Sequence, residues 1–175
     1  LGMLASIQRR LIEVATPFMH DLYARTQATV HLGVQDGVEV VYVFKVTGHR
    51  SRPLPSRIGG RMPLYCTAVG KALLAFSPPE LTEQVIEQGL ERVGPRTITA
   101  PGLLRRQLAT IRQSGLAFEA EESAVGVTCV AAPILDAAML PAAALSVTGT
   151  TSSFKPEAHA GAVAAAAAGI SEGLG

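Results

Sequence analysis

The sequence predicts an α+β domain in which helices flank a mostly antiparallel sheet. Two observations carry this prediction. Hairpin-linked β-rich runs stand on both sides of a central helical block, and helical patterns occupy both ends of the chain. Helices at both termini can cover one face of the sheet, which leaves the other face to the middle loop and helices, where a pocket can form.

The N-terminal segment predicts two consecutive helices. Apolar residues recur at helical spacing over residues 2–15. Thr16 and Pro17 then interrupt the pattern, since Thr can cap a helix and Pro fits its first position. We expect a second helix from there to about Arg25.

A β-hairpin is predicted next. Residues 28–34 and 38–46 are β-rich runs, and Asp36-Gly37 between them favours a tight turn because both residues tolerate positive φ. Strict alternation would place one set of side chains on a single face: Val38, Val40, Tyr42, Phe44 and Val46. The second strand is apolar on much of both sides, which is typical of a central strand covered by helices.

The remaining elements follow from turn residues and periodicity. Residues 48–63 are rich in Gly, Pro, Ser and Arg and predict a loop with one short strand near 54–58. Further elements are predicted in chain order: helices at 66–76, 80–88 and 101–114, strands at 116–121, 127–135 and 142–149, and an Ala-rich helix at 156–171.

Composition narrows the class of protein. The 175 residues fit one domain, and 48% hydrophobic against 17% charged residues excludes a disordered chain. A net charge of +1 does not favour a free-standing nucleic-acid binder. Two cysteines form neither a disulfide framework nor a zinc pattern, and no apolar run reaches the about 20 residues of a membrane span. The segment LGMLASIQRR does not have the residue order expected of a secretory signal. A cytoplasmic location without membrane contact is expected.

Three polar side chains on adjacent strands form the first candidate site. Val127 and Cys129 share one strand face, and Ser146 and Thr148 share a face of the next strand, with their hydroxyls roughly 7 Å apart. That separation suits the oxygens of a small carboxylate or hydroxy acid. The alternatives are hydroxyls bonded to water or nearby backbone and a cysteine that is only a small core residue.

Other polar features of the sequence also have structural alternatives. The helix start in PLYCTAVGKALLA (residues 63–75) can attract anions. Alternatively, its small residues serve only close packing of the helix on the sheet, with Lys71 on a wet surface. Glu119, Glu121 and Glu122 favour a solvated strand end or salt bridges over acid–base chemistry. The scattered histidines signal no metal site. The basic stretch 49–61 is surface charge or the mouth of an anion pocket; its basic residues are His49, Arg50, Arg52, Arg57 and Arg61.

Four segments together resemble the C-terminal effector-binding domain of IclR-family transcriptional regulators. They are DGVEVVYVFKV, IGGRMPLYCTAVGKALLA, GLAFEAEESAVGVTCVAAPILD and AALSVTGTTSSF, and their spacing agrees as well. The resemblance implies a GAF-like (profilin-like) fold with a curved antiparallel sheet, a small organic-acid effector, no cofactor and no enzymatic activity. It implies that residues 1–26 are linker and first helices and 27–175 the effector-binding domain. DNA would be bound only through an N-terminal winged helix-turn-helix, which this sequence lacks.

The resemblance also implies the residues of the effector pocket. A Gly-Ala pair of the family falls on Ala68 and Val69, and an acidic residue falls on Glu119, one carbon longer than the Asp of a well-known member. The remaining positions are a hydrophobic wall and three polar side chains: Leu54, Val127, Cys129, Ser146 and Thr148. No catalytic or metal-binding residue is implied.

Three functions follow as hypotheses. The first is a sensor that couples effector binding to DNA affinity, within a homodimer or homotetramer. The second is an oligomerisation module without a ligand, which small Ala143 and Ala144 and the Ala-rich last helix permit and which a pocket closed by side chains would favour. The third is a hydrolase using Cys129, which needs a base within hydrogen-bond reach of the thiol.

Overall fold

The computed structural model describes residues 2–48, 54 and 56–175. Within these residues the chain forms helices on both sides of a six-stranded sheet. The elements in chain order are α1 (Gly2–Thr26), β1 (Thr29–Asp36), β2 (Glu39–Val46), β3 (Arg61–Pro63), α2 (Ala68–Phe76), α3 (Pro79–Gln88), α4 (Pro101–Ser114), β4 (Ala117–Ala120), β5 (Val127–Leu135), β6 (Pro141–Thr150) and α5 (Pro156–Leu174).

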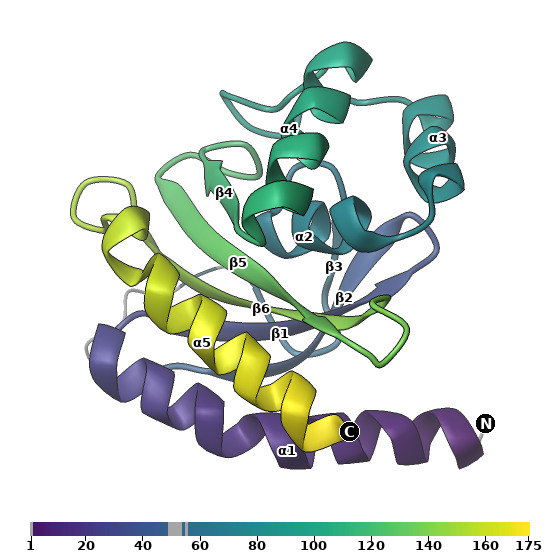
Figure 1. Cartoon of the computed structure of the whole chain (residues 1–175). Helices are drawn as coiled ribbons and strands as arrows, with labels where there is room; N and C mark the ends of the chain where they lie inside the picture. The colour runs from purple at the N-terminus through teal and green to yellow at the C-terminus, as the bar shows by residue number, and fades with distance from the viewer. Residues whose placement is uncertain (1, 49–53, 55) are drawn as a thin grey trace.

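The sheet is antiparallel throughout and lies between two helical layers. Its strand order is β3-β2-β1-β6-β5-β4, so the two hairpins meet where β1 pairs with β6. Helices α1 and α5 lie side by side against one face, whereas α2 packs on the other face with α4 and α3 beyond it (Figure 1). This arrangement confirms the predicted α+β class with a curved antiparallel sheet.

Two apolar clusters match the two faces of the sheet. One joins α1 and α5 to the sheet through side chains such as Met19, Leu145 and Ile170. The other joins α2 and α4 to the opposite face through Leu73, Leu104 and the small side chains of β5 and β6. Residues of β5 and β6 alternate between the clusters, as the predicted alternation requires.

The N-terminal segment is a single helix, so the prediction of two helices broken at Thr16-Pro17 was wrong. Pro17 lies inside α1 and cannot donate a backbone hydrogen bond to the preceding turn. The Thr16 hydroxyl donates to the carbonyl of Ile12 at 2.6 Å. A continuous buried stripe crosses the proline, namely Leu11, Ala15, Met19 and Leu22, and its packing on the sheet and α5 outweighs the local break.

The first hairpin forms as predicted, but a bulge in β2 changes which side chains share a face. Leu32 pairs with Phe44 and Gly33 with Tyr42, which leaves Val43 as an extra residue. Val40 and Tyr42 therefore face α2, whereas Phe44 and Val46 pack in the α1–α5 cluster. The prediction of one shared face from Val38 to Val46 was wrong beyond Tyr42, because a bulge reverses the alternation.

The short strand of the middle loop lies later than predicted. β3 pairs Arg61–Pro63 with β2, after a turn in which Gly59 has φ +82° and its N–H donates to the carbonyl of Tyr42 at 2.7 Å. Within the range 54–58, Leu54 and residues 56–58 form no strand, and residue 55 lies outside the described residues. His49, Arg50 and Arg52 of the basic stretch also lie outside them.

The remaining helices and strands match their predicted positions to within about three residues at each end. The end of α4 shows why its position was predictable: Gly115 adopts the left-handed conformation with φ +75°, and its N–H donates to the carbonyl of Ile111. These elements bring α2 close to the sheet face that carries the predicted polar cluster.

Candidate small-molecule site

A cavity of about 410 Å³ lies between the sheet and the start of α2. Side chains from β1, β2, β4, β5 and β6 line it, together with the segments that follow β2 and β4. All eight side chains named from the sequence line this cavity: Leu54, Ala68, Val69, Glu119, Val127, Cys129, Ser146 and Thr148. The structure thus brings them together, while their role in binding stays a prediction.

The three strand side chains differ in how their polar atoms are satisfied. Cys129 and Thr148 are paired across β5 and β6, and the thiol sulfur lies 3.1 Å from the Thr148 hydroxyl. Ser146 is only 2% exposed, yet its hydroxyl has no hydrogen-bond partner in the described part of the chain. No side-chain polar atom in the described part of the chain is both fully buried and without a partner, so the Ser146 hydroxyl opens onto the cavity, where it is available to a ligand.

The thiol of Cys129 does not fit a nucleophile. Burial raises the pKa of Cys129, and the carboxyl of Glu119 raises it further, so the thiol stays protonated near neutral pH. Its polar contact is the Thr148 hydroxyl rather than a histidine. The hydrolase hypothesis required a base within reach of this sulfur, and the geometry gives it no support.

The start of α2 supplies hydrogen-bond donors to the cavity. Thr67 caps the helix, its hydroxyl accepting from the N–H of Gly70 at 3.0 Å and donating to the carbonyl of Pro63 at 2.9 Å. Ala68 and Val69 begin the helix and line the cavity, and their N–H groups have no acceptor within the helix. These amides and the helix dipole favour a negatively charged ligand group at this position.

Glu119 faces the same cavity and is almost fully buried. It is 2% exposed, and its carboxylate accepts hydrogen bonds from the Ser123 hydroxyl at 2.6 Å and from the N–H of Glu122 at 3.3 Å. Burial raises the pKa of Glu119 to about 7, against the opposing effect of these hydrogen bonds. The expectation of a solvated strand end was wrong here, because the turn after β4 folds back over the carboxyl.

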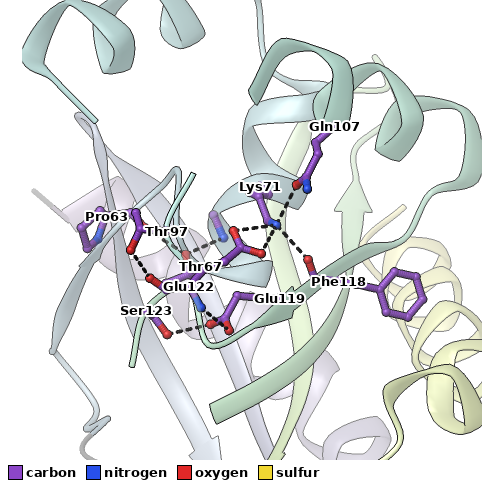
Figure 2. A network of polar contacts seen from close by, with 10 residues as sticks. Pro63, Thr67, Lys71, Thr97, Gln107, Phe118, Glu119, Glu122 and Ser123 are labelled. Atoms are coloured by element: carbon purple, nitrogen blue, oxygen red, sulfur yellow. Dashed lines mark hydrogen bonds and ion pairs between the residues drawn. The ribbon is translucent and has the colours of Figure 1, made fainter. Parts of the chain in front are cut away.

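Behind this turn, a buried ion pair joins the pocket wall to α2 and α4 (Figure 2). Lys71 is fully buried, and its Nζ lies 2.8 and 3.0 Å from the carboxylate oxygens of Glu122. The same ammonium donates to the carbonyl of Phe118 at 2.8 Å and to the Gln107 side chain at 3.0 Å. One of the two alternatives placed Lys71 on a wet surface, and that placement was wrong, because four acceptors replace its water.

Glu122 is the salt-bridge partner that one reading of the acidic cluster predicted. Burial raises the pKa of Glu122, whereas the Lys71 ammonium opposes that rise. The carbonyl of Glu122 accepts from the Thr97 hydroxyl at 2.6 Å, so the turn is also bound to the segment that precedes α4. These contacts fix the backbone that presents Ser123 and Ala124 to the cavity.

Sequence analysis missed several lining residues, and His31 is the most informative. Its Nε2 lies 2.6 Å from the Ser56 hydroxyl, and its ring lies 5.0 Å from that of Tyr42. Burial and, to a smaller extent, the positive charge of Lys45 together lower the pKa of His31 to about 3, so the ring is neutral. The signal was present, because alternation in β1 places His31 on the face of Gly33, where α2 approaches.

The described residues of the basic stretch lie at the mouth of the cavity. Arg61 pairs with Asp36 at 2.5 Å and with Glu39 at 3.3 Å, and all three side chains are largely exposed. Arg57 also lines the cavity and is exposed. In the described ranges, no three His, Cys, Asp or Glu side chains gather as a metal site, and no helix is long and apolar enough to span a membrane.

Comparison with known proteins places this arrangement in a family. Residues 4–172 match the sequence family described as the C-terminal domain of the bacterial transcriptional regulator IclR. The Escherichia coli regulator KdgR is 36% identical over 159 residues, which cover 90% of this chain and 60% of KdgR. The chain spans little more than half of the length of curated relatives such as KdgR.

Solved structures agree with the sequence match. The structure of Thermotoga maritima IclR has a TM-score of 0.90 and 37% identity, and the match covers 98% of this chain and 72% of that one. An IclR homolog from Microbacterium hydrocarbonoxydans, solved in complex with 4-hydroxybenzoate, has a TM-score of 0.90 and 31% identity over 95% of this chain and 69% of that one. These relatives are regulators rather than enzymes, and the chain belongs to the IclR family of bacterial transcriptional regulators, whose C-terminal effector-binding domain it represents.

Proposed function

We propose that the cavity binds a small organic acid and that this binding alters the DNA affinity of the regulator. The observation that carries the proposal is the Ser146 hydroxyl, which opens onto the cavity and lacks a partner in the described part of the chain. It shares one cavity with the N-terminus of α2, where Ala68 and Val69 present backbone donors. A carboxylate accepts hydrogen bonds from both groups at once.

The size and lining of the cavity suit a small, partly apolar acid. Its volume of about 410 Å³ lies at the lower end of the range for small-molecule sites. Leu54, Met62, Val69 and Val127 supply apolar walls beside the polar groups. The 4-hydroxybenzoate in the Microbacterium homolog supports this class of ligand. A cavity of this volume does not favour the alternative of a ligand-free oligomerisation module, which a pocket closed by side chains would support.

Coupling to DNA requires that the ligand favour one arrangement of the helices outside the sheet. β1 and β6 contribute His31, Ser146 and Thr148 to the cavity and contact α1 or α5 through their opposite faces. We propose that α1, the linker segment of residues 1–26, transmits this difference to a DNA-reading domain in a cytoplasmic homodimer or homotetramer. A coupling of roughly 1–3 kcal/mol gives a 5- to 150-fold change in DNA affinity.

Isothermal titration calorimetry tests the binding step, with 4-hydroxybenzoate and pyruvate as probes. Ser146→Ala and Ser146→Ala/Thr148→Ala are compared with Ser152→Ala, which removes an exposed hydroxyl. Each hydrogen bond to a charged group is worth about 1.5–3 kcal/mol, so removing the Ser146 hydroxyl is expected to weaken probe binding by roughly 10- to 150-fold. Equal affinity of the double variant and the Ser152→Ala control would contradict the site, and binding of neither probe would contradict the ligand class.

A further inference from the structure

The carboxyl of Glu119 stands in the same cavity as the proposed anion subsite, and this inference rests on the proposed function. Both groups line one space of about 410 Å³. Glu119 is 2% exposed and receives its two hydrogen bonds from an uncharged hydroxyl and an uncharged backbone N–H. An anionic ligand would therefore place a second negative charge beside a carboxyl that water does not screen.

The lysine and arginine side chains near Glu119 either pair with other groups or are exposed to solvent. Lys71 is bound by both carboxylate oxygens of Glu122, by Gln107 and by the carbonyl of Phe118. Arg61 is half exposed and pairs with Asp36 and Glu39 at the cavity mouth, and Arg57 is exposed. Among the described residues that line the cavity, no buried cationic side chain remains to balance two negative charges.

The other ionisable groups around Glu119 do not change this balance. Glu122, on the same turn, is neutralised by Lys71 from α2. Burial raises the pKa values of Tyr42 from β2, of Cys66 before α2 and of Cys129 from β5, so these three groups stay uncharged near neutral pH. His31 from β1 is neutral as well.

We propose that Glu119 takes up a proton when an anionic effector enters the cavity, so that the domain binds its ligand together with a proton. The protonated carboxyl gains a hydroxyl that can donate to the ligand, whereas the ionised carboxyl can only repel it. The ligand and the proton then bind cooperatively, which makes the affinity of the sensor depend on pH.

The expected pH dependence follows from linkage. The pKa of Glu119 is about 7 without a ligand, since burial disfavours the charged carboxylate. If only the protonated form binds an anion, the dissociation constant rises about tenfold for each pH unit above that value. At pH 8 close to one proton is taken up per ligand bound, and at pH 6 almost none.

Calorimetry in pairs of buffers with different ionisation enthalpies measures the proton uptake directly: MES and imidazole at pH 6, HEPES and imidazole at pH 7, and HEPES and Tris at pH 8. The probes are 4-hydroxybenzoate and pyruvate, titrated at each pH into the wild-type protein, Glu119→Gln and the exposed control Glu87→Gln. Glu119→Gln replaces the carboxyl by a neutral group of the same shape. It is expected to bind with a pH-independent affinity and no proton uptake, whereas Glu87→Gln keeps the wild-type pH dependence.

The outcomes separate this inference from the proposed function. Probe binding that depends on Ser146 but shows no proton uptake at pH 8 overturns the inference and leaves the organic-acid site intact. Binding of neither probe contradicts the proposed ligand class. In that case ¹³C NMR of the side-chain carboxyls in the ligand-free wild-type protein decides: the inference requires one carboxyl, absent in Glu119→Gln, that titrates near pH 7, and titration of every carboxyl below pH 5 overturns it.

Discussion

Substituting Lys71 by methionine should destabilise the domain strongly. Lys71 is fully buried, and Met has a similar length but no charge and no hydrogen-bond donor. The substitution therefore creates little empty space. It leaves the Glu122 carboxylate, the Phe118 carbonyl and the Gln107 side chain without the ammonium that they share.

The size of the expected loss in unfolding free energy follows from the burial of Glu122, the partner of Lys71. Glu122 is 7% exposed, so its carboxylate cannot recover full hydration when Lys71 is removed. Breaking a buried pair by removing one partner costs roughly 3–5 kcal/mol. For a chain of 175 residues, each kcal/mol lowers Tm by about 2–4 °C, so Lys71→Met should lower Tm by roughly 6–20 °C.

Urea denaturation at pH 7, followed by circular dichroism, measures this cost. Lys155→Met is the matched control, because Lys155 is exposed and its replacement should change stability by less than about 0.5 kcal/mol. Glu122→Met on the Lys71→Met background should restore part of the loss, because two apolar side chains leave no charge buried. A loss below about 1 kcal/mol for Lys71→Met, or a double variant less stable than Lys71→Met alone, would refute the buried ion pair.

Two further predictions concern the close packing and the neutral histidine of the site. Gly70→Ala should lower the free energy of unfolding, measured by urea denaturation, by about 1–3 kcal/mol, because the new Cβ would collide with the backbone of Leu64. In the control Gly161→Ala the new Cβ meets nothing, so this variant should gain up to about 1 kcal/mol. Equal effects of the two substitutions would contradict the close packing at Gly70. The pKa of His31 is lowered to about 3 by burial and then by Lys45, below the 6.5 of an unfolded histidine. Its contribution to stability is therefore present above pH 6.5 and is lost as pH falls toward 3. His31→Asn should lose less unfolding free energy than wild type between pH 6.5 and 4, and parallel losses would show that the imidazole is not buried in its neutral form.

Local pattern was enough to predict most of the fold. Alternation located β5 and β6, and turn residues located the hairpin and the end of α4, because these signals arise within a few neighbouring residues. The continuity of α1 through Pro17 and the bulge at Val43 were missed. Both depend on packing against distant elements, and a single sequence offers no local sign of that packing.

In the candidate site, too, features set by local pattern were predicted and features set by contacts between distant residues were missed. Strand alternation brought Cys129, Ser146 and Thr148 to one face, and family resemblance added Glu119 and the start of α2. Lys71 was misjudged because nothing in its helix shows that Glu122, 51 positions further along the chain, folds back to meet it. Alternation in β1 could have placed His31 on the cavity face, whereas its contact with Ser56 depends on a loop whose path the sequence does not indicate.

The most direct test of the organic-acid site is a crystal structure of the domain grown with 4-hydroxybenzoate. The proposed function predicts the ligand inside the cavity, with its carboxylate about 3 Å from the Ser146 hydroxyl and from the backbone N–H of Ala68 or Val69. A ligand bound outside the cavity, or bound inside it with the Ser146 hydroxyl uncontacted, would contradict the proposed function.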